Sequence, residues 1–180
     1  MSDIKVLVLL GSLRAASINR QLAELAIESA PDGVSLELFD RLGELPFYNE
    51  DIDNDEVAES VVALRAAAAD ASAALVVTPE YNGTIPGVLK NAIDWLSRPF
   101  GNGALKDKPL AVVGGAYGQF GGVWAHDETR KSFGIAGVRV VEELKLSLKF
   151  GELDGKHPRE NAEVAATLRD IVGKLVAEIG

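Results

Sequence analysis

Short apolar runs along the chain predict a sheet whose strands are largely buried. Three of these runs are almost wholly apolar: residues 4–10, 73–78 and 110–113. Continuous runs of this kind are typical of strands covered on both faces of a parallel sheet. Residues 34–39 alternate apolar and polar positions instead, as a strand exposed on one side does. A fifth strand is expected at residues 138–141, extending towards Leu148.

Between these strands, apolar positions recur at the spacing of a helix. Three segments carry such a stripe: Ile18, Leu22, Leu25 and Ala26; Val57, Val61, Leu64 and Ala68; Val88, Ala92, Trp95 and Leu96. A fourth helix is expected around His126. The last segment has the longest stripe, from Val164 to Ile179, and Pro158 is expected in its first turn.

Strand and helix therefore alternate five times, which predicts a doubly wound α/β fold. Parallel neighbours need right-handed crossover connections, and these place helices on both faces of the sheet. The half-polar second strand belongs at an edge, so the expected strand order is 2-1-3-4-5. With 180 residues and no repeat or linker, we expect a single domain over residues 1–180.

Composition narrows the classes of function. The net charge of −9 disfavours nucleic acids and anionic membranes as partners. The chain has no cysteine, so disulfides and thiolate chemistry are excluded and any redox chemistry must come from a bound cofactor. The N-terminus shows no basic, apolar leader, which predicts a cytoplasmic protein with no membrane segment. Neither histidines nor acids have the spacing of a metal site.

The loops after strands one, three and four should converge, because ligands of open parallel sheets bind where the strand order reverses. These loops are residues 11–19, 79–87 and 114–122. The first offers hydroxyl, guanidinium and amide donors at a helix start, which suits one phosphate. No G-x-G-x-x-G occurs in the chain, so a mononucleotide is favoured over a dinucleotide. The alternative is that Ser17 or Asn19 only caps the helix and Arg14 is solvated.

The second loop carries two prolines and two glycines, so it combines stiffness with tight turns. Exposed N–H groups on such a loop could hold the edge of a flat heterocycle; the alternative is an ordinary turn with Tyr81 packed on a neighbour. The third loop is rich in glycine, which leaves room for a planar group. The acidic residues 40–55 form either a surface connection or part of the rim of the site.

Two motifs together resemble those of a known family. The first is Gly11-Ser12-Leu13-Arg14 with Ser17 and Asn19. The second is Thr-Pro-Glu-Tyr-Asn-Gly at residues 78–83, continued by the sequence of residues 86–95. Both, in this order, resemble the NADPH-dependent FMN reductases with a flavodoxin-like fold, a group that includes bacterial quinone, chromate and azo-dye reductases. The resemblance covers essentially the whole chain and implies a three-layer sandwich around a five-stranded parallel sheet.

The resemblance also implies how FMN is held. The first motif would bind its phosphate, residues 79–83 would run along the isoalloxazine ring, and residues 114–122 would flank the other edge of the ring. The residues assigned to the cofactor in this way are Ser12, Arg14, Ser17, Ile18, Asn19, Pro79, Glu80, Tyr81, Asn82, Gly83, Gly115, Ala116, Tyr117 and Gly118.

The activity implied is transfer of hydride from NADPH or NADH through FMN to a quinone, or to chromate or an azo compound. Because the flavin carries the chemistry, no catalytic side chain is expected, and His126 and His157 are expected at the surface or an interface. Relatives form homodimers or homotetramers, in which Trp124 and Phe133 would be buried against a partner; the alternative is packing within the chain.

Two other functions compete with this interpretation. One is an FMN-binding electron carrier or sensor of the flavodoxin type, without efficient turnover of small molecules. The other is a hydrolase that uses Ser12 or Ser17, which is remote because the chain has no G-x-S-x-G motif.

Overall fold

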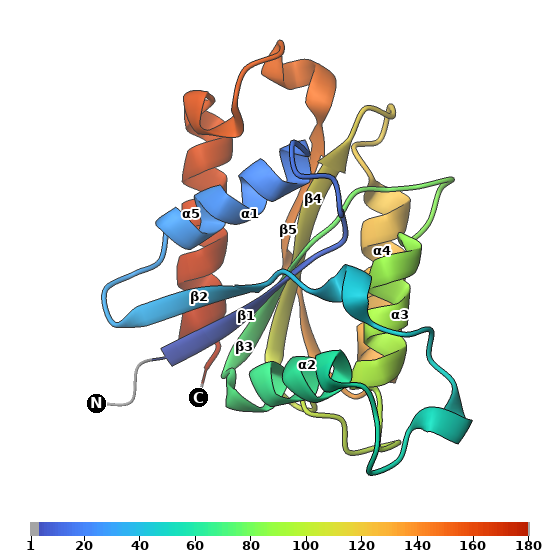
Figure 1. Cartoon of the computed structure of the whole chain (residues 1–180). Helices are drawn as coiled ribbons and strands as arrows, with labels where there is room; N and C mark the ends of the chain where they lie inside the picture. The colour runs from blue at the N-terminus through green and yellow to red at the C-terminus, as the bar shows by residue number, and fades with distance from the viewer. Residues whose placement is uncertain (1–3, 180) are drawn as a thin grey trace.

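Five strands alternate with five α-helices in the computed structural model, which describes residues 4–179. In chain order these are β1 (Ile4–Leu10), α1 (Ile18–Glu28), β2 (Val34–Phe39), α2 (Glu59–Asp70), β3 (Ala73–Val77), α3 (Gly87–Leu96), β4 (Pro109–Ala116), α4 (Val123–Ile135), β5 (Arg139–Lys149) and α5 (Ala162–Ala177). Short 3-10 turns lie at η1 (Leu42–Glu44), η2 (Glu50–Ile52), η3 (Phe150–Leu153) and η4 (Pro158–Glu160). All strand pairs are parallel in the order β2-β1-β3-β4-β5, which confirms the predicted sheet (Figure 1).

The helices cover both faces of the sheet, as predicted (Figure 1). Helices α1 and α5 pack on one face, where Val6, Val8 and Leu10 of β1 join their core. Helices α2, α3 and α4 pack on the other face, where Leu7 and Leu9 point. This alternation along one strand follows from the two-residue period of β structure. None of the helices formed by residues 4–179 has the length and apolar character needed to cross a bilayer.

Strand β4 extends further than the apolar run 110–113 indicates, because two glycines continue it. A Cβ on Gly114, whose φ is +150°, would lie 2.1 Å from the carbonyl oxygen of Thr78. A Cβ on Gly115 would lie 2.4 Å from the carbonyl oxygen of Leu148. Glycine at both positions therefore lets the carboxyl ends of β3, β4 and β5 approach closely.

Pro158 does not begin the last helix, so that prediction was wrong. It lies in η4, which is closed by a capping box: Arg159 N donates to His157 Nδ1 and His157 N donates to Glu160 Oε1. The chain then starts α5 anew at Ala162, where the side chain of Asn161 accepts two backbone N–H bonds.

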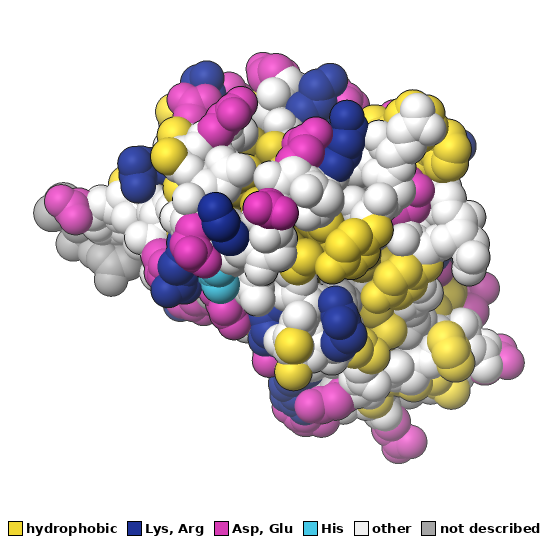
Figure 2. All heavy atoms as spheres, turned by 90° about the horizontal axis from the view of Figure 1, so that it is seen from above, with side chains coloured by type: hydrophobic (Ala, Val, Ile, Leu, Met, Phe, Trp, Pro, Cys, Tyr) yellow, Lys and Arg dark blue, Asp and Glu magenta, His cyan; other side chains and the backbone are white. Residues whose placement is uncertain are grey.

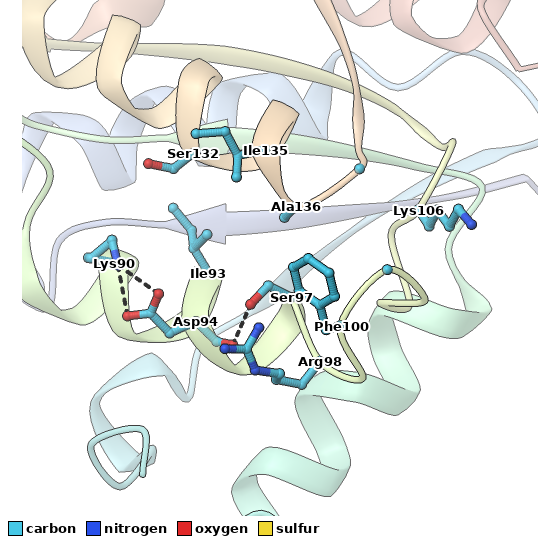
Figure 3. Close-up of a pocket in the computed structure, with 12 residues that line it drawn as sticks. Lys90, Ile93, Asp94, Ser97, Arg98, Phe100, Lys106, Ser132, Ile135 and Ala136 are labelled. Atoms are coloured by element: carbon cyan, nitrogen blue, oxygen red, sulfur yellow. Dashed lines mark hydrogen bonds and ion pairs between the residues drawn. The ribbon is translucent and has the colours of Figure 1, made fainter. Parts of the chain in front are cut away.

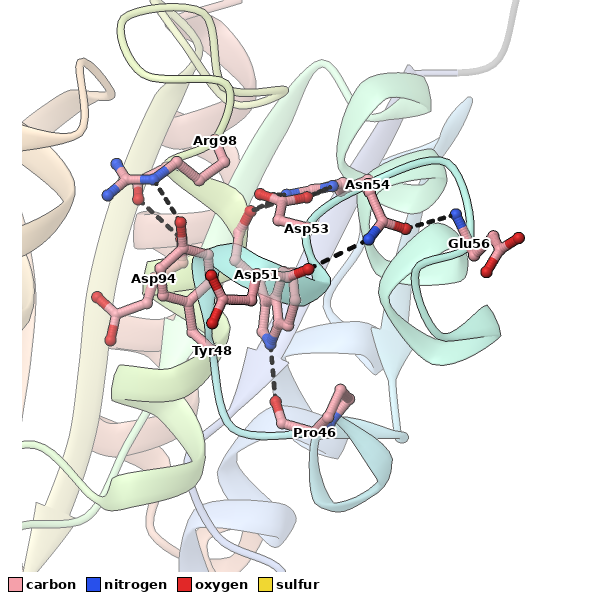
Figure 4. Close-up of polar contacts among 11 residues, drawn as sticks. Pro46, Tyr48, Asp51, Asp53, Asn54, Glu56, Asp94 and Arg98 are labelled. Atoms are coloured by element: carbon pink, nitrogen blue, oxygen red, sulfur yellow. Dashed lines mark hydrogen bonds and ion pairs between the residues drawn. The ribbon is translucent and has the colours of Figure 1, made fainter.

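Residues 40–55 pack against α2 and α3 (Figure 4). Trp95 Nε1 donates to the carbonyl oxygen of Pro46 at 2.8 Å, and Arg98 Nε donates to the Tyr48 hydroxyl at 2.9 Å. Arg65 forms a forked ion pair with Asp53, and these hydrogen bonds hold the pKa of the Asp53 carboxyl below its usual value. The segment is thus a surface connection, and the cavity described below is lined by other parts of the chain.

Candidate functional site

A cavity of about 370 Å³ lies beyond the carboxyl ends of β1, β3 and β4, at the point where the strand order reverses. Figure 2 shows this end of the molecule, where hydrophobic side chains gather between charged ones. The cavity is lined by Ser12, Arg14, Ser17, Ile18, Asn19, Pro79, Glu80, Tyr81, Gly115, Ala116, Tyr117, Gly118 and Phe150. The structure thus brings together every residue expected at the site except Asn82 and Gly83, which form the turn just beyond the lining.

The first loop presents the start of α1 to the cavity. Ser17 is the N-cap, and its Oγ accepts the Arg20 N–H at 2.9 Å, as the capping alternative expects. The hydroxyl hydrogen of Ser17 is still available to donate. Ser12 is also buried, whereas Arg14 is exposed at the edge of the cavity. A helix N-terminus, two hydroxyls and a guanidinium form an environment that favours a phosphate.

Asn19 has a structural role besides the ligand contact that its motif predicts. Its side chain is buried, with Nδ2 donating to the Gly115 carbonyl at 3.1 Å and Oδ1 accepting the Gly115 N–H at 2.9 Å. Both polar atoms of the amide are therefore paired with the backbone of β4. Asn19 fastens the first loop to the third and so sets the width of the cavity between them.

The second loop folds into a tight turn. Tyr81 and Thr84 exchange two backbone hydrogen bonds of 3.1 Å each, and Asn82 and Gly83 between them have φ of 52° and 75°. Positive φ at both central residues is the signature of a type I′ turn, which asparagine followed by glycine favours. Tyr81 is 50% exposed and lines the cavity, so it is not packed away on a neighbour.

Helix α4 holds this second loop from behind. The Ala125 N–H donates to Glu80 Oε2 at 3.2 Å, and His126 Nε2 lies 3.0 Å from the carbonyl oxygen of Thr78. His126 is fully buried, so the expectation of a surface or interface position was wrong. Burial, with a smaller contribution from Arg130, lowers the pKa of His126.

The sequence held only a weak signal for this burial, because Ala125 and Phe133 are the apolar members of the inward-facing stripe of α4. The residues of α4 that are buried recur at positions 125, 126, 129, 130 and 133, which is the inward stripe of a helix. Phe133 is among them and packs within its own chain, whereas Trp124 is 54% exposed.

The third loop brings an aromatic pair to the cavity. Tyr117 is 77% exposed, and its ring meets that of Phe150 edge-to-face with 5.3 Å between centroids. Phe150 follows β5, so a search restricted to the loops after strands one, three and four did not include it. The signal that could have found it is an aromatic residue placed directly after a strand.

A second groove of about 370 Å³ runs between α3 and α4 (Figure 3), and its lining shares no residue with that of the first cavity. Its lining includes the apolar Ile93, Phe100 and Ile135, and the charges of Lys90 and Asp94 pair with each other at 2.6 Å. It lacks a helix N-terminus or a glycine loop, so its chemistry is that of a contact surface rather than a phosphate site.

The cavity beyond the strand ends fits FMN in three respects. Its phosphate end combines the start of α1 with Arg14, and its other walls are two stretches of backbone, residues 79–81 and 115–118. Gly11 and Gly114 lie where a Cβ would collide with Thr78, so the ends of the strands come together as a close-fitting floor. These are the elements that a phosphate tail and a flat ring require.

Comparison with known proteins shows what the chain is similar to. The model of the family of NADPH-dependent FMN reductases matches residues 4–152. A 2-hydroxy-1,4-benzoquinone reductase from Burkholderia sp is 39% identical over 151 residues, which cover 83% of this chain and 80% of that protein. A quinone reductase from Pseudomonas putida is 44% identical over 133 residues, covering 73% and 71%.

Among solved structures, the flavoenzyme FerB, an NAD(P)H:(acceptor) oxidoreductase from Paracoccus denitrificans, superposes with a TM-score of 0.83 at 30% identity. The match covers 97% of this chain and 98% of FerB. A family match over most of the chain, these relatives and the flavodoxin-like sheet lead to one conclusion: the chain belongs to the NADPH-dependent FMN reductase family.

Proposed function

We propose that this protein is an NAD(P)H-dependent oxidoreductase that uses bound FMN to reduce quinones. The observation that carries the proposal is a cavity that joins the N-terminus of α1 to a gap walled by backbone. Bound FMN would supply the redox chemistry, accepting hydride from NAD(P)H and returning electrons to the acceptor. The protein then has to bind and orient FMN, NAD(P)H and the acceptor, and it needs no nucleophile or metal of its own.

The chain's residues divide this work between the two ends of the cavity. Arg14 and the hydroxyls of Ser12 and Ser17 would neutralise and hydrogen-bond the phosphate, together with the N–H groups at the start of α1. Residues 79–83 and 115–118 would hold the edges of the ring through backbone groups. Glu80 is already bonded to the Ala125 N–H, so we expect its carboxylate to brace the loop rather than bind the flavin.

The acceptor class follows from the mouth of the cavity. Tyr81 and Tyr117 line the cavity and are 50% and 77% exposed, and their two phenol rings offer apolar faces to a flat molecule. We therefore propose quinones as acceptors, in line with the names of the two relatives above. Chromate and azo compounds are further acceptors to compare in the same assay.

We also propose that the protein forms a homodimer or homotetramer and acts in the cytoplasm, where its reductant is available. Phe100 and Ile135 on the second groove are 87% and 76% exposed, and Trp124 beside the site is 54% exposed. Large apolar side chains left in water at this density support self-association. Mass measurement in solution by sedimentation tests the assembly.

The test of the activity starts with the chromophore. Purified protein should release FMN, and NADPH added without oxygen should bleach the flavin absorbance. NADPH and NADH oxidation are then compared across a panel of quinones, with chromate and an azo dye alongside. A yellow protein that stays oxidised would refute the proposal. Bleaching followed by slow turnover on every small acceptor would refute it in favour of an electron carrier.

A further inference from the structure

The first turn of α4 contacts the second loop of the site, and Thr78 directly before it, through three consecutive residues. A Cβ on Gly83 would lie 3.5 Å from the Trp124 ring, the Ala125 N–H bonds Glu80, and His126 bonds Thr78. Trp124 is half exposed, and Ala125 contributes only its backbone. His126 is therefore the one side chain of the three that is completely buried while bonded to the loop.

The partners of His126 fix which of its nitrogens carries hydrogen. A carbonyl oxygen can only accept, so Nε2 must donate to Thr78 O over 3.0 Å. In the uncharged ring Nδ1 is then the acceptor, and the Ser147 hydroxyl donates to it over 2.8 Å. Both nitrogens are satisfied in a fully buried ring, so β5, α4 and the end of β3 are tied together by one side chain.

The carbonyl group that His126 holds is also confined by its neighbours. A Cβ on Gly114 would come within 2.1 Å of Thr78 O, and a Cβ on Gly122 within 3.2 Å of His126 Nε2. The Thr78 hydroxyl adds a bond to the carbonyl oxygen of Pro79 at 2.9 Å. The peptide joining Thr78 to Pro79 is therefore held on several sides, and its plane directs the chain into the wall of the cavity.

We propose that His126 is a positioning residue of the flavin site: through Thr78 O it orients the Thr78–Pro79 peptide, and thereby the backbone that contacts the ring. The proposal rests on the proposed use of FMN. His126 itself does not line the cavity, and Pro79, Glu80 and Tyr81 do. Its effect on the cofactor is therefore transmitted by one hydrogen bond and the rigid proline that follows.

Two substitutions separate this role from simple packing. His126→Leu fills the space without a donor, whereas His126→Gln keeps an amide N–H for Thr78 O and an oxygen for the Ser147 hydroxyl. Each apoprotein is titrated with FMN, with affinity followed by quenching of flavin fluorescence and ring environment by visible circular dichroism. We expect the Leu variant to bind FMN about tenfold more weakly, with an altered dichroism spectrum, and the Gln variant to recover both.

Thr129→Val is the matched control. Thr129 is as buried as His126 and lies one turn further along α4, but its hydroxyl bonds only the Ala125 carbonyl within the helix. Its loss should lower stability and leave FMN affinity and dichroism unchanged. If Thr129→Val weakens FMN as much as His126→Leu does, general loosening of α4 explains the effect and the proposal is overturned.

Wild-type affinity and dichroism in a folded His126→Leu variant would also overturn it. Should that variant fail to fold, Ser147→Ala decides, because it keeps the ring but removes the donor that fixes its orientation; an unchanged dichroism spectrum there would refute the role of His126. A wild-type protein that fails to bind FMN would instead refute the proposed function.

Discussion

Replacing Asn19 with alanine should destabilise the protein even when FMN is absent. The side chain amide of Asn19 pairs with both the N–H and the carbonyl of Gly115, across 96 positions of sequence. Removing it leaves two buried backbone groups unpaired, each at a cost of about 1–3 kcal/mol. We expect a loss of about 3 kcal/mol, towards the lower end of the sum, because the adjoining cavity lets water reach part of the vacated space.

The assay is urea unfolding of the apoprotein, followed by far-ultraviolet circular dichroism. For a chain of this length, a loss of about 3 kcal/mol corresponds to a drop in melting temperature of about 6–12 °C. Asn19→Asp should also destabilise, because one carboxylate oxygen would face the Gly115 carbonyl where Nδ2 now donates. Asn102→Ala is the control: Asn102 is exposed, and its loss should change stability by less than about 0.5 kcal/mol.

The result that would refute this reasoning is specific. If the Asn19→Ala apoprotein is as stable as the wild type while its FMN affinity falls, the side chain acts on the ligand and not on the backbone of β4. Equal losses of stability in the Asn19 and Asn102 variants would show that the two bonds to Gly115 contribute nothing of their own.

Three further predictions test other parts of the site. Arg14→Ala should raise the FMN dissociation constant about 10- to 100-fold in fluorescence titrations, because it removes a charge-assisted hydrogen bond. Arg169→Ala, on the exposed side of α5, should leave the constant unchanged. Equal affinity in both variants would contradict a phosphate role for Arg14. Folding lowers the pKa of His126 below 6.5, so between the folded-state pKa and pH 6.5 the unfolded chain binds more protons than the folded one. The stabilising effect of the neutral ring is therefore complete above pH 6.5 and is lost as the pH falls towards the folded-state pKa. In that window the free energy of unfolding should change by at most about 1.4 kcal/mol per pH unit. Urea midpoints between pH 5 and 8 should show this component in the wild type and not in His126→Gln, and identical pH profiles would contradict it. Gly114→Ala should lower the free energy of unfolding in urea by more than about 3 kcal/mol, since its Cβ would lie 2.1 Å from Thr78 O. A Cβ at Gly118 meets no atom within 4 Å, so Gly118→Ala should leave stability unchanged. A stable Gly114→Ala protein would show that the strand ends can separate.

The sheet could be predicted from sequence because burial there is a local signal. The apolar run of β3 is buried at every position, and the alternating β2 does lie at an edge. The end of β4 was misjudged because glycine ordinarily marks a loop, whereas here Gly114 and Gly115 remain in the strand to let neighbouring chains approach. The two glycines are required by contacts with Thr78 and Leu148, which are distant in the sequence and so leave no signal in the local pattern.

The site could be predicted only in part for the same reason. Loops at strand ends converge by topology, so the cavity forms where the strand order reverses. The pairing of Asn19 with Gly115 and of His126 with Thr78 joins residues 96 and 48 positions apart. Motif spacing marked Asn19 as a ligand residue, which stays a prediction; spacing alone could not distinguish a side chain that contacts only a ligand from one that also holds the backbone.

Burial makes that distinction on physical grounds. A polar group that is buried when no ligand is present must have its hydrogen-bond partners within the protein, because an unpaired buried group would destabilise the folded state. Asn19 and His126 meet this condition through backbone partners, so their loss should be felt by the apoprotein. Arg14 and Tyr117 are exposed, so water satisfies their polar groups when no ligand is bound. Their replacement should therefore change ligand affinity and leave the stability of the apoprotein unchanged. Comparing apoprotein stability with FMN affinity for the same variants therefore shows which side chains of the cavity hold the backbone and which contact the ligand.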